Sequence, residues 1–250
     1  MLEQTFHTPL PLDLEVVIHS GDIEIETVDG EESHVTVDGD ERLLAEVEIR
    51  QDGNRVVVSY RGKVKFGFSL GPFFGSYELR VRAMVPHGAN VKVKTASADT
   101  EVSGRLGSLD VNAVSGDVNV RGEIAGDVVL KTVSGDTDLE RVGGKVSAQT
   151  VSGDVRVGPA GGSVDTKTVS GDIRCAGVTE GDVRFTSVSG DIEIGIAAGS
   201  LVDIDAGSTS GDLSSEVPLA SQPANGEGNG GPTVVVRGRT VSGDVRVFRS

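Results

Sequence analysis

Eight aspartates recur at nearly equal spacing along the chain, and most of them end the short motif Ser-Gly-Asp. Carboxylates stacked in this way have the chemistry of a cation-binding ladder, since neighbouring charges about 5 Å apart repel by roughly 1 kcal/mol in water and need compensation. Backbone N–H donors at a turn are the alternative source of compensation, and we favour them because Asp side chains readily accept hydrogen bonds from nearby backbone. These residues are Asp99, Asp117, Asp136, Asp154, Asp172, Asp191, Asp212 and Asp244.

An aromatic cluster lies in the stretch FGFSLGPFFGSY at residues 66 to 77, among Gly, Ser and Pro. We expect its rings to cover one end of the fold, because large apolar patches seldom stay exposed in monomers. The alternative is a contact surface for a second subunit, another protein or a membrane interface. The candidate partner contacts are therefore Phe66, Phe68, Phe73, Phe74 and Tyr77.

The sequence contains no nucleophile elbow, phosphate loop or dinucleotide fingerprint, and its four histidines show no metal-ligand spacing. Asp203 and Asp205 fall near Asp191 and Glu193, an arrangement that would suit a carbohydrate-acting enzyme. Their spacing, however, follows the repeat and indicates no reaction. We predict a protein that is not an enzyme and that has no cofactor and no metal site.

An internal repeat positions these residues. The Ser of each motif falls at 97, 115, 134, 152, 170, 189, 210 and 242, so the steps are 18, 19, 18, 18, 19, 21 and 32 residues. An outlying copy, HSGDIEIE, occupies residues 19 to 26. A fixed period of this length is the signature of stacked structural units.

Side chains alternate on both sides of each motif, which indicates strands with one buried face. Before the motif, apolar residues such as Val128, Leu130 and Val146 share one parity, and residues such as Lys131 and Gln149 take the other. After it, a second strand places residues such as Val155 and Val157 inward. Two strands in about 18–19 residues predict an all-β fold, namely a β-solenoid or single-stranded β-helix.

The motif itself breaks the alternation, so we interpret it as the corner of each coil. Gly supplies a backbone conformation that other residues avoid, and Ser and Asp bond to local backbone groups. The predicted structural corner consists of Gly116, Asp117, Gly135, Asp136, Gly153, Asp154, Gly171, Asp172, Gly190 and Asp191.

These repeated motifs resemble the bacterial "putative adhesin" β-strand-repeat proteins, a domain family of unknown function marked by recurring SGD turns. The resemblance includes HSGDIEIE, the stretch VRAMVPHGANVKVKTASAD and the repeats from 97 to 194. It implies a β-solenoid and the label of adhesin, with no catalytic residues to transfer. A surface location is suggested only by that label.

The repeat also divides the chain. We expect residues 1–90 to form a β segment that caps the solenoid, with VEIRQDGNRVVVSY as a hairpin, and residues 91–250 to form the coils. The stretch EVPLASQPANGEGNGGP at 216–232 predicts a mobile loop, because it is rich in Gly, Pro and Asn. The chain ends at TVSGDVRVFRS, so we expect the last strand, with Val245 and Val247, to be an uncovered edge.

Charge limits the partners. The net charge of −15 argues against nucleic acid, which requires a cationic track. The N-terminus has neither a basic start nor a long apolar run, and no later segment approaches about 20 apolar residues. We therefore expect a cytoplasmic protein without membrane contact.

Three functions are consistent with these observations. The first, which we favour, is a non-enzymatic interaction scaffold that binds a protein partner or itself, as a weak homodimer. The second is a solenoid that forms stacks or filaments through an uncovered end. The third is a carbohydrate-acting or cation-binding solenoid.

Overall fold

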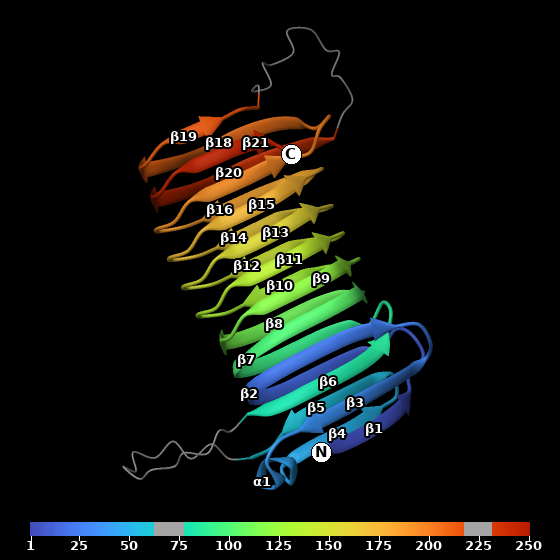
Figure 1. The fold of residues 1–250 in the computed structure, drawn as a ribbon. Coiled ribbons are helices and arrows are strands. Elements are labelled where there is room, and N and C mark those ends of the chain that lie inside the picture. The colour runs from blue at the N-terminus through green and yellow to red at the C-terminus, as the bar shows by residue number, and fades with distance from the viewer. Residues whose placement is uncertain (63–77, 218–231) are drawn as a thin grey trace, which may run out of the picture.

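The computed structural model describes residues 1–62, 78–217 and 232–250. Within these residues the chain is almost entirely β-structure, with one short helix, α1 (Glu41–Leu44), and Figure 1 shows the strands stacked into a long column. The predicted all-β solenoid is confirmed. No helix in the described part of the chain has the length and apolar character required to cross a membrane.

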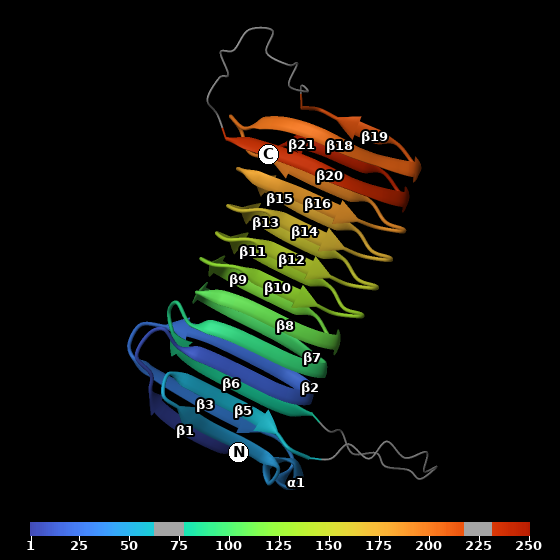
Figure 2. The same cartoon turned by 180° about the vertical axis from the view of Figure 1, so that it is seen from behind.

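Each regular coil contributes one strand to each of two faces (Figures 1 and 2). The first-strand face holds the strand that precedes the corner of each coil, and the second-strand face holds the strand that follows it. The first-strand face contains β8 (Ser108–Ser115), β10 (Val128–Lys131), β12 (Val146–Gln149), β14 (Val164–Lys167) and β16 (Gly181–Thr186). The second-strand face contains β9 (Val118–Ile124), β11 (Thr137–Val142), β13 (Val155–Ala160), β15 (Ile173–Val178) and β17 (Ile192–Ile196).

Neighbouring coils pair in parallel with equivalent residues side by side. Val128 lies beside Val146 on the first-strand face, and Val155 lies beside Ile173 on the second. The apolar residues of both faces point inward and form continuous buried columns, while Lys131 is exposed. The inward and outward assignment made from the alternation is therefore confirmed.

The N-terminal strands form the other end of the column. Strand β2 (Asp13–Val28) pairs in parallel with β7 (Asn90–Leu106) over most of its length, so it has the geometry of a coil. On its other side β2 pairs in parallel with β5 (Arg55–Tyr60) and β6 (Leu79–Pro86). Three strands that pair antiparallel complete this end of the column, namely β1 (Leu2–His7), β3 (Glu32–Asp38) and β4 (Val47–Asp52).

The predicted hairpin is confirmed, since β4 and β5 pair antiparallel and Asp52 lies beside Arg55. The division of the chain at residue 90 stays a prediction.

The C-terminal coils do not stack in chain order. Strand β20 (Thr233–Ser242) lies between β16 and β18 (Leu201–Ser210), and β21 (Val245–Arg249) lies between β17 and β19 (Leu213–Ser215). Figure 1 shows the red strands of the C-terminus beneath the orange strands that precede them in sequence.

The expectation that the last strand is an uncovered edge is wrong, because Val245 and Val247 are fully buried between two neighbours. The coil formed by β18 and β19 ends the column instead.

Candidate functional site: the corners of the coils

The corner of each coil is a column of glycines with positive φ. Gly153, for example, has φ +134°, and a Cβ built on it would lie 2.1 Å from the carbonyl oxygen of Gly135 in the preceding coil. The next corner, Gly171, has φ +136° and would meet the Gly153 carbonyl oxygen at 2.2 Å. Gly is therefore required at this position for its backbone conformation and for the close approach of neighbouring coils.

The aspartates next to these glycines form a ladder of hydrogen bonds along the column. The backbone N–H of Asp154 donates to Oδ1 of Asp136 at 2.9 Å, and the N–H of Asp172 donates to Oδ1 of Asp154 at 3.0 Å. The same bond joins the other neighbouring coils from Asp99 to Asp212, and Asp244 takes its place between Asp191 and Asp212.

Backbone N–H groups thus compensate the carboxylates, as favoured from the sequence. The donor N–H belongs to the next coil and not to a turn within the same motif. The sequence of one motif predicts a local bond and does not reveal this partner. Within the described residues, no group of three or more His, Cys, Asp or Glu side chains is arranged to hold a metal ion.

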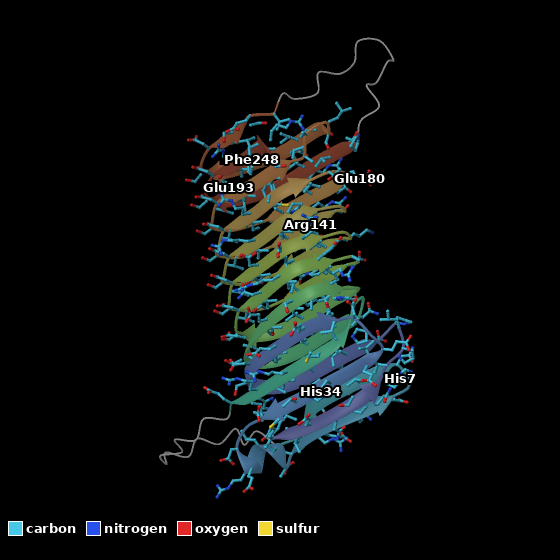
Figure 3. The ribbon with its side chains drawn as sticks, turned by 45° about the vertical axis from the view of Figure 1, so that its right-hand side comes forward. His7, His34, Arg141, Glu180, Glu193 and Phe248 are labelled. Carbon is cyan, nitrogen blue, oxygen red and sulfur yellow. The ribbon has the colours of Figure 1, made fainter. Side chains whose placement is uncertain are left out.

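The acidic residues considered for catalysis lie on different faces. Asp205 lies on β18 and binds Arg239 of β20 at 2.8 Å, and this ion pair lowers the pKa of the Asp205 carboxyl. Glu193 lies on β17 of the second-strand face, where it binds Arg174 at 2.5 Å. Figure 3 shows Glu193 near Phe248, which belongs to the neighbouring strand β21. The expected proximity of Asp203 and Asp205 to Asp191 and Glu193 is therefore not observed.

An ion cluster near the N-terminal end is centred on a buried carboxylate, whereas its two cations are half exposed. Glu15 of β2 is 8% exposed and lies between two cations, with Lys94 Nζ at 2.9 Å and Arg55 on the other side. The hydrogen bond from Lys94 is the main reason that the pKa of Glu15 is lowered, although burial opposes it. The cluster joins β2 to β5 through Arg55 and to β7 through Lys94, which gives it a structural role.

The residue before each Ser forms an exposed apolar ridge, which sequence reasoning did not single out. Thr150 points inward, so the alternation already predicts that Val151 points outward. The ridge runs through six neighbouring coils, and its members are 46–55% exposed. We call it the valine ridge, and it consists of Val114, Val133, Val151, Val169, Val188 and Val241.

A shallow groove of about 420 Å³ runs beside the valine ridge on the first-strand face. Its floor includes Thr150 and Thr168, which are both largely buried. Its outer wall includes Lys131, Gln149 and Lys167, which are paired side by side in consecutive coils. The corner therefore combines an apolar ridge with a groove whose outer wall carries two lysines.

The aromatic residues proposed as partner contacts, Phe66, Phe68, Phe73, Phe74 and Tyr77, lie outside the described residues. Their stretch joins β5 to β6. Their role stays a prediction.

Comparison with known proteins places the fold among solved structures. The family model Toastrack DUF4097 matches residues 12–248. The chain is similar to a "putative adhesin" from Bacteroides fragilis with 13% identity and a TM-score of 0.57, over 98% of this chain and 96% of that one. It is similar to a "putative lipid binding protein" from Parabacteroides distasonis with 16% identity and a TM-score of 0.59, over the same shares of 98% and 96%. No curated protein sequence matches the chain.

Proposed function

We propose that this chain, which belongs to the Toastrack DUF4097 family, is a non-enzymatic scaffold that binds a protein along the valine ridge. The observation that carries the proposal is the repetition of half-exposed valines at one position through six neighbouring coils. Together they present on the order of a few hundred Å² of apolar surface, which is within the size range of patches that are often functional. The names of the similar structures, an adhesin and a binding protein, support a binding role in general terms.

The fold explains how such a scaffold works. Because each coil is fixed to its neighbours by strand pairing and by the Asp ladder, the ridge is a rigid straight surface about 24 Å long at a coil spacing of about 4.8 Å. A partner that binds it loses entropy, but the scaffold itself is already ordered. Affinity is therefore obtained from shape and apolar contact without rearrangement of the coils.

The proposal is tested by affinity capture from the native cell with the wild-type protein and with a variant carrying Val133→Ser, Val151→Ser and Val169→Ser. A second copy of the chain or another protein should be retained by the wild type and lost by the variant. Retention of the same set of proteins by both would refute a role for the ridge. Flotation with phospholipid vesicles provides a control for lipid binding, the property in the name of the Parabacteroides structure.

A stack-forming function is supported by one observation at the C-terminal end. Leu213 of β19 lies beside the buried Val245 at an inward position, yet it is 48% exposed because no strand of the described residues covers it. The N-terminal end instead finishes with antiparallel strands, so the two ends differ. End-to-end association through the open coil would therefore produce a pair and not a long filament.

The cytoplasmic location expected from the sequence remains a proposal. Cell fractionation with an antibody to the protein would test it.

A further inference from the structure

We propose that the valine ridge is a homodimer interface in which two solenoids lie side by side and point the same way. This inference rests on the proposed scaffold function and names a second copy of the chain as the partner. The ridge and the groove beside it run parallel to the column axis through the same coils. The ridge of one copy can therefore enter the groove of the other, and the reverse contact follows from the same two-fold symmetry.

Charge supports the pairing. Lys131 and Lys167 stand on the groove side of the ridge and, among the described residues, neither has an ion-pair or hydrogen-bond partner for its ammonium group. In each coil the chain passes first through the lysine position, then through the ridge valine and then through the corner aspartate. The column of carboxylates, which includes Asp136 and Asp172, therefore lies on the side of the ridge away from the lysines. The valine ridge thus separates the two lysines from the column of carboxylates.

This separation selects one orientation. With the two-fold axis parallel to the solenoid axes, the lysine side of one copy faces the aspartate side of the other. Equal coils then lie at equal heights, which places Lys131 opposite Asp136 of the second copy and Lys167 opposite Asp172. An antiparallel arrangement would place lysines against lysines and aspartates against aspartates, which is destabilising.

The size of the surface indicates a weak dimer. The ridge contributes on the order of a few hundred Å² of apolar area, which is smaller than the area of about 800 Å² per partner in a standard stable interface. Contacts from the groove walls add to it. We therefore expect association that depends on protein concentration.

Sedimentation equilibrium over a concentration series measures this association. The triple variant Val133→Ser, Val151→Ser and Val169→Ser should weaken the dimer at least tenfold, because it removes half of the ridge. Lys131→Glu with Lys167→Glu should also weaken it, since like charges would then face each other. Thermal unfolding checks that the variants remain folded. Leu213→Ser is the matched control, because it replaces an equally exposed apolar residue at the end of the column.

Cysteine cross-linking tests whether the two solenoids point the same way. Its result is the formation of a disulfide bond, so a misfolded variant would not be mistaken for a positive result. The native Cys175 is buried, which raises the pKa of its thiol to about 12, so it stays protonated and unreactive at pH 8. In the parallel dimer, Val133→Cys should form a disulfide with the same residue of the second copy, and Val188→Cys should do so as well. In an antiparallel dimer, residues at the two ends of the ridge would be far from their own equivalents.

Three results would overturn the inference. They are a wild type that stays monomeric at the highest concentration, a dimer that survives the triple variant but is lost with Leu213→Ser, and a dimer in which neither Val133→Cys nor Val188→Cys forms a cross-link. A monomeric wild type would leave the scaffold proposal intact if affinity capture showed a different protein bound to the ridge.

Discussion

The corner glycines provide the sharpest test of how the coils are held together. In Gly153→Ala the new Cβ would lie 2.1 Å from the carbonyl oxygen of Gly135 and 2.8 Å from its carbonyl carbon. Both atoms belong to the backbone of the neighbouring coil, so no side-chain rotation can relieve the overlap. The positive φ of +134° adds strain that costs about 1–3 kcal/mol for a residue with a Cβ.

Relief of the overlap requires the two coils to move apart at the corner. This movement would weaken two hydrogen bonds between the coils. They are the bond from the N–H of Ser152 to the carbonyl oxygen of Val133 and the bond from the N–H of Asp154 to Oδ1 of Asp136, and each contributes about 1 kcal/mol. Summed with the strain, the expected loss is about 3–5 kcal/mol in the free energy of unfolding.

Gly53→Ala is a matched control for backbone strain alone. Gly53 also has a positive φ, +60°, but its Cβ would meet no atom within 4 Å. This variant should lose only about 1–2 kcal/mol. Urea unfolding followed by circular dichroism measures both values. Equal losses in the two variants would refute the argument that close contact between coils requires Gly at the corner.

Val155→Asp should lose about 3–5 kcal/mol, because it places an unpaired charge in a buried column, and urea unfolding would show it. Asp154→Ala should cost about 1–2 kcal/mol because the N–H of Asp172 loses its acceptor, whereas Asp154→Asn, which retains an acceptor oxygen, should cost clearly less; similar losses would argue against the ladder. The pKa of Glu15 is lowered from its ordinary value of 4.5, so its contribution to stability is present above pH 4.5 and is lost as the pH falls through the lowered folded-state value. In Glu15→Gln, the free energy of unfolding should therefore depend less on pH across this window. Deletion of residues 233–250 should leave residues 201–215 without strand partners, so their amides should exchange rapidly in hydrogen-exchange measurements; retained protection would contradict the observed strand order.

The alternation of side chains predicted most of the fold because it depends on physics within one coil. Inward residues such as Val128 and Val155 follow from the period of two, and the glycine corner follows from the break in that period. The exposure of Val151 was equally predictable, since it is the neighbour of the inward Thr150. The Asp ladder was only half predictable, because its donors come from another coil and a single motif does not specify which coil lies next to it.

The order of the last coils was not predictable from spacing. The strands of every coil carry nearly the same motif, so many pairs of coils have compatible registers. The step of 32 residues before the last motif is long enough for the chain to pass back over one coil and insert the last coil beneath it, but the same length is also compatible with stacking in chain order. The observed order therefore depends on side-chain packing.

Packing favours the observed order in two ways. The inward residues Val234 and Val236 of β20 are fully buried between two neighbours, whereas Leu213 in the outer coil is 48% exposed. A coil with a neighbour on each side buries more apolar surface than a terminal coil, which stabilises it at about 25 cal/mol per Å² of apolar surface buried. At the position where the inner coil has the buried Val247, the terminal coil has Ser215, which loses less by lacking a second neighbour.

The second reason is the fit around Phe185, the bulky aromatic residue of β16. Its neighbour in β20 is Gly238, and a Cβ at that position would lie 2.6 Å from the ring atoms Cγ and Cδ2 of Phe185. In chain order, β18 would lie beside β16 and would bring Ala206, which has a Cβ, to the position of Gly238. The glycine therefore allows β20 to pack closely against the aromatic ring, and this local complementarity distinguishes one order of coils from another when the repeated motifs do not.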